Sequence, residues 1–154
     1  MTGKIRLMKF IADEAVHFFS AFLIGLACGA IFGQWWLVLV SLASGFFIDA
    51  DHLFDYFHHF GLKKFRWRNF IKVKTYMDSS GKVFVPLHGW EYLLIFWMIG
   101  SMAPFPGLKW TAAGAYLAHL FWDHISFQHH PLFYFFCFRM VKKFNLRLLK
   151  VAHG

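Results

Sequence analysis

The stretch SGFFIDADHLFDYFHHFG, from Ser44 to Gly61, decides the fold, because an apolar run turns there into a dense group of ionisable side chains. Between positions 49 and 59 it holds three aspartates and three histidines, namely Asp49, Asp51, His52, Asp55, His58 and His59. Ionisable groups at the edge of an apolar helix are costly, so each needs a partner, water or a metal ion. We expect a helix that ends in cation ligands, with its last members, Asp55, His58 and His59, at the wet surface.

The composition of the whole chain points to a lipid bilayer. The 154 residues suit a single domain, residues 1–154, and 58% of them are apolar, including 22 phenylalanines. The 16 lysines and arginines outnumber the 8 acidic residues, and they cluster beside apolar runs. We therefore expect anionic lipid headgroups, and not nucleic acid, as their counter-charge. The two cysteines, Cys28 and Cys137, lie in apolar runs and are predicted to be packed thiols.

The apolar runs predict an all-α integral membrane protein with four transmembrane helices. Twenty helical residues reach about 30 Å, which is the thickness of the hydrocarbon core. The four helices are expected at about residues 14–33, 35–54, 86–103 and 108–127. Residues 61–85 are predicted to form a basic loop with a short hairpin within residues 71–85. Residues 132–150 are expected to lie on the membrane surface as an interfacial amphipathic helix.

Basic residues are divided unevenly between the two ends of these four helices. Four spans place both termini and the 61–85 loop on one side, which then holds 15 of the 16 lysines and arginines. Only Lys109 falls on the other side. By the positive-inside rule, we expect a multi-pass protein of the inner (plasma) membrane with both termini in the cytoplasm.

The same topology predicts that ionisable side chains from four helices meet at one level, just inside the cytoplasmic interface. His17 lies near the start of the first helix, the 49–59 stretch ends the second, and His88 opens the third. His119 and Asp123 lie in the last half of the fourth helix. We therefore predict a metal centre with ligands drawn from His17, Asp49, Asp51, His52, His88, His119 and Asp123.

Imidazole and carboxylate ligands without a thiolate suit a divalent ion, with zinc first and manganese or iron next, and with one or two ions per chain. Such an ion lowers the pKa of bound water and polarises a carbonyl or phosphoryl oxygen. A surplus carboxylate, Asp51 or Glu91, is expected to act as general base. Alternatively, Glu91 serves only to favour the positive N-terminal end of its helix. In the His88/Glu91 and His119/Asp123 pairs, either both members bind the ion or one orients the other.

The order of these motifs resembles a known family, the inner-membrane metal-dependent hydrolases that are also described as LexA-binding, membrane-associated hydrolases. Its pattern is an early His, an Asp-x-Asp that closes the second helix, a His that opens the third, and a late His-x-x-x-Asp. The matching positions are His17, Asp49, Asp51, His88, His119 and Asp123, and the resemblance covers about residues 14–127. The chain departs from the pattern at Ile48, where the family often has Pro, and at Gly89, where it often has Arg.

The resemblance and the position of the site at headgroup depth both favour hydrolysis of a lipid or lipid-linked ester or phosphoester. A metal-ion or proton transporter is an alternative, but transport sites tend to lie near the membrane midplane. A di-iron lipid hydroxylase or desaturase would need several intact histidine boxes, and the sequence has none. A non-catalytic scaffold stabilised by its metal also stays open. The oligomeric state is not predicted.

Overall fold

The computed structural model describes residues 3–66, 70, 80–127 and 130–149, and the regular elements within these ranges are all helices. This confirms the predicted all-α class. The elements are α1 (Gly3–Phe32), α2 (Leu37–Gly45), η1 (Phe47–Asp49), α3 (Ala50–Phe60), η2 (Leu62–Lys64), α6 (Glu91–Met102), α7 (Leu108–Ser126), α8 (Phe136–Val141) and α9 (Leu146–Leu149).

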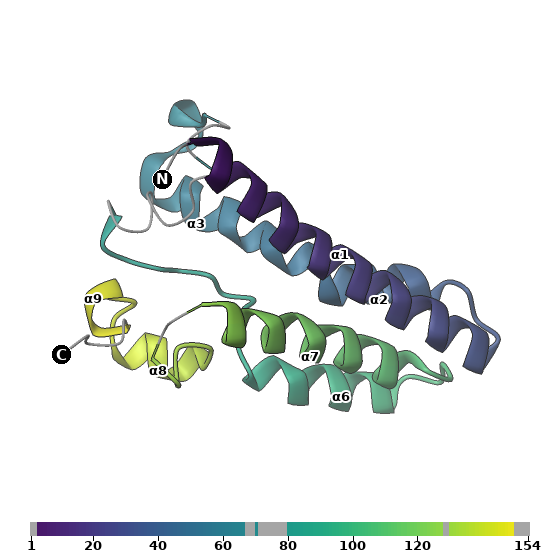
Figure 1. Ribbon diagram of the computed structural model, residues 1–154. Coiled ribbons are helices and arrows are strands. Elements are labelled where there is room, and N and C mark those ends of the chain that lie inside the picture. Colours follow the sequence, from purple (N-terminus) through teal and green to yellow (C-terminus); the bar gives the residue numbers. More distant parts are fainter. Residues whose placement is uncertain (1–2, 67–69, 71–79, 128–129, 150–154) are drawn as a thin grey trace.

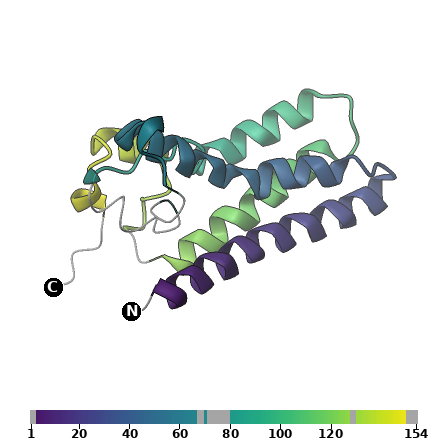
Figure 2. The ribbon, with the colours of Figure 1, turned by 90° about the horizontal axis from the view of Figure 1, so that it is seen from above.

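The long helices lie side by side, and α7 is the one that joins them. It contacts α1, α2 and α6, while α1 also packs along α2. The connection between α1 and α2 and the connection between α6 and α7 lie at one end of the molecule (Figure 1). The start of α1 lies at the opposite end, with α3, α8 and α9, and a second view agrees (Figure 2). Elements far apart in the sequence therefore gather at one end.

Two glycines allow α1, α2 and α7 to approach closely. A Cβ on Gly25 of α1 would lie 2.7 Å from Val38 Cα of α2. A Cβ on Gly45, the last residue of α2, would lie 2.9 Å from the Ala115 side chain of α7 and 3.0 Å from that of Ala21 in α1. Only a residue without a side chain fits at such contacts. Gly45 thus sits where three helices meet.

The helix predicted at 35–54 is broken in the structure. The helix α2 ends at Gly45, the 3₁₀ turn η1 follows, and α3 continues at an angle of 45° to α2. A short 3₁₀ stretch between helical segments often marks a functional position. Asp49 is the last residue of this turn, and Asp51 lies in the first turn of α3.

The structure supports part of the predicted membrane topology. Among the described residues, the segment Leu7–Phe32 is long and apolar enough to cross a membrane, and the bent α2–α3 pair would be a second if it forms one span. The helix α6 has 12 residues, fewer than the predicted 86–103, because the preceding residues form turns. The helix α7 has 19 residues, but it includes His119 and Asp123. Four transmembrane helices therefore stay a prediction.

Residues 130–149 differ from the expected surface helix. They form the short helices α8 and α9, and their side chains Phe133, Tyr134, Leu146 and Leu149 are buried against Val83, Val85 and Tyr116. An antiparallel bridge joins Lys82 to Asn145. The predicted hairpin falls largely on residues 71–79, which lie outside the described residues. Apolar residues of the C-terminal segment thus belong to the protein core rather than to one membrane-facing stripe.

Candidate metal centre

Three imidazoles and two carboxylates from four parts of the fold meet in the protein interior. His17 comes from α1, Asp49 from η1 and His88 from the turns before α6, while His119 and Asp123 lie one turn apart on α7. All of them are buried except Asp49, which is partly buried. The convergence predicted from topology is therefore present in the structure for these residues.

The donor atoms are spaced as ligands of one ion would be. The Nε2 atoms of His88 and His119 lie 3.2 Å apart, and each is 3.5 Å from Asp123 Oδ2. Asp49 Oδ1 lies 3.2 Å from His88 Nε2 and 3.8 Å from His119 Nε2. His17 Nε2 is 3.1 Å from Asp123 Oδ1. Ligand atoms that each lie about 2.0–2.2 Å from one ion are about 3–3.5 Å apart, so this set could hold a metal ion.

His119 is oriented by the break between α2 and α3. Its Nδ1 lies 2.9 Å from the carbonyl oxygen of Gly45, which can only accept a hydrogen bond, so Nδ1 bears the proton. The Nε2 lone pair of His119 is then left facing the donor cluster. The ring of His17 stacks on that of His119, with centroids 3.9 Å apart. The hydrogen bond from the His119 ring N–H to the Gly45 carbonyl is of the kind that usually orients a metal-binding histidine.

His88 is oriented in the same manner by a carboxylate. Its Nδ1 lies 3.0 Å from Asp51 Oδ2, and the same oxygen accepts a hydrogen bond from the backbone N–H of Leu87 at 2.8 Å. The sequence placed Asp51 among the ligands and the bases. The structure places it behind His88, where it holds the ring so that Nε2 faces the cluster. His52 lies at the margin, with Nε2 3.6 Å from Asp49 Oδ1.

Glu91 lies outside the cluster, although it was predicted to serve the site as a base. Its two carboxylate oxygens accept hydrogen bonds from the backbone N–H groups of Phe136 and Cys137, each at 3.0 Å. These are the first two residues of α8. Glu91 therefore satisfies free N–H groups at the start of a neighbouring helix, while it also lies in the first turn of its own helix, as the alternative prediction had it.

Two buried side chains near the cluster were not expected from the sequence. Asp55 was expected at the surface, yet it is fully buried and accepts a hydrogen bond from the backbone N–H of Phe84 at 2.7 Å. Its position one helical turn after Asp51, on the same face, was a signal for this. Arg139 is also fully buried. Nothing in its local sequence distinguishes it from the other basic residues of the C-terminal segment.

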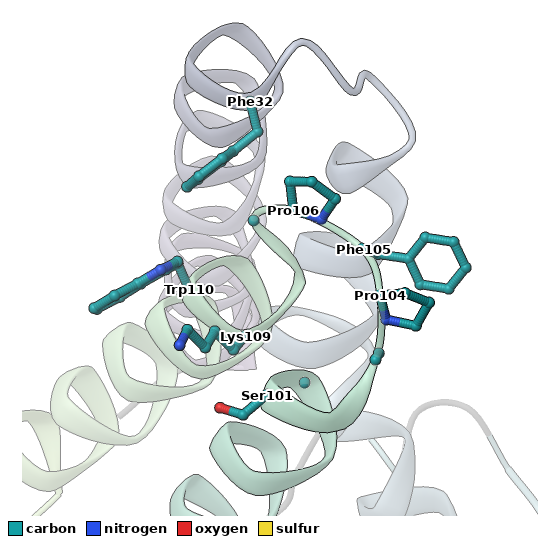
Figure 3. Close-up of a pocket in the computed structure, with 10 residues that line it drawn as sticks. Phe32, Ser101, Pro104, Phe105, Pro106, Lys109 and Trp110 are labelled. Carbon is teal, nitrogen blue, oxygen red and sulfur yellow. The ribbon is translucent and has the colours of Figure 1, made fainter.

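A pocket of about 380 Å³ lies at the opposite end of the helices. The turn between α6 and α7 lines it together with Phe32 and Trp110, as Figure 3 shows. The ammonium group of Lys109 lies 5.2 Å from the ring centre of Trp97 and 5.4 Å from that of Trp110. The pocket and the metal centre share no residue.

These side chains form a candidate metal centre. They come from four parts of the fold, their donor atoms lie close together, and hydrogen bonds orient two of the histidine rings. Comparisons with protein-family models, with curated proteins and with solved structures find no match to this chain.

Proposed function

We propose that the protein is a membrane-embedded, metal-dependent hydrolase in which His17, Asp49, His88, His119 and Asp123 hold a divalent ion. The observation that carries the proposal is the spacing of 3.1–3.8 Å between donor atoms from α1, η1, the turns before α6, and α7. His17, His119 and Asp123 form one group of three whose ligand atoms lie close enough together to hold an ion. Asp49, His52 and His88 form a second group of three that could receive another ion.

A buried carboxylate oxygen supports a metal at this place. Asp49 Oδ2, on the carboxylate whose Oδ1 lies near His88 Nε2, is buried and has no hydrogen-bond partner among the described residues. A buried polar group without a partner costs about 1–3 kcal/mol, a cost that a bound ion or water would relieve. A mixed imidazole and carboxylate set without thiolate fits zinc first, and manganese or iron next.

A membrane location is supported by the outward faces of the helices. Large apolar side chains are more than half exposed on α1, α2, α6 and α7, for example Leu23, Leu39, Ile99 and Phe121. Exposed apolar side chains on several helices are what a membrane-embedded protein presents to lipid. We propose that α1, the bent α2–α3 pair, α6 together with the turns before it, and α7 cross the inner membrane, with both termini in the cytoplasm. The centre then lies near the cytoplasmic headgroups, where a lipid or lipid-linked ester or phosphoester can reach it.

A bound ion would supply an activated water and would polarise the ester or phosphoryl oxygen. The chain itself supplies proton acceptance and orientation. Asp49 is the most exposed of the five ligands, with 16% of its side chain accessible, so it is the ligand best placed to accept the proton of the attacking water. Asp51 and the Gly45 carbonyl keep the lone pairs of His88 and His119 directed into the centre.

A metal-stabilised scaffold is the second candidate function. The burial of His17, His88, His119 and Asp123 favours it, because a structural metal site is closed whereas a catalytic one keeps an open position. Asp49 and His52 are only partly buried, so a water or substrate would enter the centre beside them. Catalysis therefore depends on access past these two residues.

The test is elemental analysis of the detergent-purified protein, followed by ester and phosphoester hydrolysis in mixed micelles. We expect one zinc, manganese or iron per chain, and loss of both metal and hydrolysis in His119→Ala. His58→Ala is the matched control, because it removes an exposed histidine from α3. Metal without hydrolysis of any lipid ester or phosphoester would favour the scaffold. A wild-type protein that stays metal-free after reconstitution with each ion would overturn the proposal.

A further inference from the structure

The ligand His88 lies on a segment that is not helical, residues 83–90, and this segment is fixed by contacts from other elements. On one side two carboxylates of α3 accept backbone hydrogen bonds, because Asp55 binds the N–H of Phe84 and Asp51 binds the N–H of Leu87. The donors are three residues apart and the carboxylates are one helical turn apart. The α3 helix thus binds two of the N–H groups of the 83–90 segment.

On the other side, Arg139 of α8 holds the carbonyl groups of the same segment. Its Nη1 donates to the carbonyl oxygen of Val85 at 2.9 Å, and its Nη2 donates to the carbonyl oxygen of His88. The guanidinium carbon lies 5.8 Å and 5.7 Å from the ring centres of Phe133 and Phe136. Arg139 is fully buried, unlike the exposed Arg147 of α9. Its guanidinium therefore binds the protein backbone rather than lipid headgroups.

Burying a guanidinium without a carboxylate in direct contact is costly. Burial lowers the pKa of Arg139, while the charge of Asp51 acts in the opposite direction. Arginine nevertheless stays protonated in proteins, so a full positive charge lies beside the metal ligand. A lysine or a neutral apolar residue would fill the same space without binding both carbonyls. The guanidinium group can donate to two carbonyl oxygens at once, and Arg139 does so here.

We propose that Arg139 is a positioning residue of the metal centre, which fixes the backbone of His88 so that its Nε2 faces His119 and Asp123. The inference rests on the proposed metal centre. His88 is then held at two points, with its carbonyl on Arg139 and its ring on Asp51. Loss of Arg139 would free the carbonyl and let the ring move away from the other ligands.

A positioning role of Arg139 and a merely structural role have different effects on metal affinity. A structural role would lower the stability of the folded protein and leave its affinity for metal unchanged. If Arg139 has a positioning role, its loss lowers the affinity for metal in protein that is still folded, because His88 is no longer held in the binding orientation. Loss of the groups that orient a metal ligand typically reduces affinity by about 10- to 100-fold.

The experiment titrates metal-free, detergent-purified protein with Co²⁺, whose visible absorption reports ligand number and geometry, and with Zn²⁺ in competition. The variants are Arg139→Met and Arg139→Lys, and Arg147→Met is the matched control with the same charge change at an exposed site of the same segment. The folded fraction of each variant is fixed by circular dichroism and size exclusion.

We expect wild type and Arg147→Met to bind equally, Arg139→Met to bind about 10- to 100-fold more weakly with an altered Co²⁺ spectrum, and Arg139→Lys to lie between them. Equal affinity and equal spectra in Arg139→Met and wild type would overturn the positioning role while leaving the metal centre intact. If Arg139→Met does not fold, the comparison of Arg139→Lys with wild type decides in the same manner. Absence of binding in wild type would overturn the metal centre itself.

Discussion

His119 of α7 donates its Nδ1 proton to the carbonyl oxygen of Gly45, and this 2.9 Å hydrogen bond joins the central helix to the point where α2 ends. The carbonyl is available because α2 gives way to the turn η1 there. The bond also requires that residue 45 has no side chain, since a Cβ would lie 2.9 Å from the side chain of Ala115. The break in the helix and the orientation of a metal ligand are therefore one feature.

Gly45→Ala should destabilise the protein and weaken metal binding together. Forcing a methyl group into a closed contact typically costs about 1–3 kcal/mol, and the relief of that contact would shift the carbonyl away from His119. Thermal unfolding and zinc titration in detergent measure both effects. Gly114→Ala is the matched control, because a Cβ there would meet only Ile24 at 3.9 Å. Equal effects of the two substitutions would contradict the close-contact account.

Asp51→Asn should weaken metal binding without abolishing it. The amide can still accept a hydrogen bond from Leu87, but it lacks the charge that supports the His88 ring. We expect a loss of about 10- to 100-fold in zinc affinity, measured by competition with a chelator. Asp123→Asn replaces a proposed ligand, so this variant should bind zinc far more weakly than Asp51→Asn does. If Asp51→Asn were the more severe change, Asp51 would be a ligand as the sequence first indicated.

Asp55→Ala should lower the free energy of unfolding by about 1–3 kcal/mol, because the buried N–H of Phe84 would lose its acceptor. The partners of its carboxylate are Phe84 and His59, neither of which is among the five ligands, so the number of ions per chain should stay the same. Thermal unfolding and elemental analysis make the comparison. His58→Ala, on the same helix and exposed, should change neither quantity. A loss of metal stoichiometry in Asp55→Ala alone would place Asp55 within the centre.

Removal of the metal should lower the unfolding midpoint. A ligand that binds only the folded state stabilises it by about 4 kcal/mol at 1,000 times its dissociation constant. The measurement is thermal unfolding in detergent with added zinc and with a chelator. The shift should disappear in His119→Ala, which lacks a buried ligand. A shift of equal size in that variant would show that zinc acts elsewhere on the protein.

Labelling of single cysteines in intact cells tests the four-span topology. In a Cys28→Ser background, the exposed Cys137 should resist a membrane-impermeant maleimide applied from outside. With Cys137 also replaced by Ser, Ser101→Cys should react, because it lies beside the turn between α6 and α7 at the other end of the helices. Protection of both positions, or reaction of Cys137, would contradict the proposed orientation.

The sequence predicted the meeting of the ligands because topology alone brings helix ends together. His17, Asp49, His88, His119 and Asp123 do lie close in the structure, whereas the four transmembrane helices from which this was predicted stay a prediction. The different positions of Asp49 and Asp51 could not be predicted, although the two residues are only two apart in the sequence. Asp49 ends the 3₁₀ turn and Asp51 lies in the first turn of α3, so their side chains point in different directions. A change of turn type is not encoded in residue spacing.

The partners of Glu91 and Arg139 were also beyond prediction. Glu91 binds the start of α8, and Arg139 binds carbonyls more than 50 residues earlier in the chain. A charged residue in a short amphipathic stretch has no local pattern that separates a buried position from a surface one. The burial of Arg139 follows from tertiary packing of Phe133, Leu146 and Leu149 on the 83–90 segment.

The proposed positioning of His88 by Arg139, which donates to its carbonyl oxygen, implies an order of events during biosynthesis. All five ligands precede residue 139 in the chain, so the ribosome completes them before it makes the group that fixes one of them. A nascent protein can insert its helices first and acquire a tight metal site only after α8 has emerged and folded back. Metal loading would then follow the folding of α8, and a chain that stops before Arg139 would bind the ion about 10- to 100-fold more weakly.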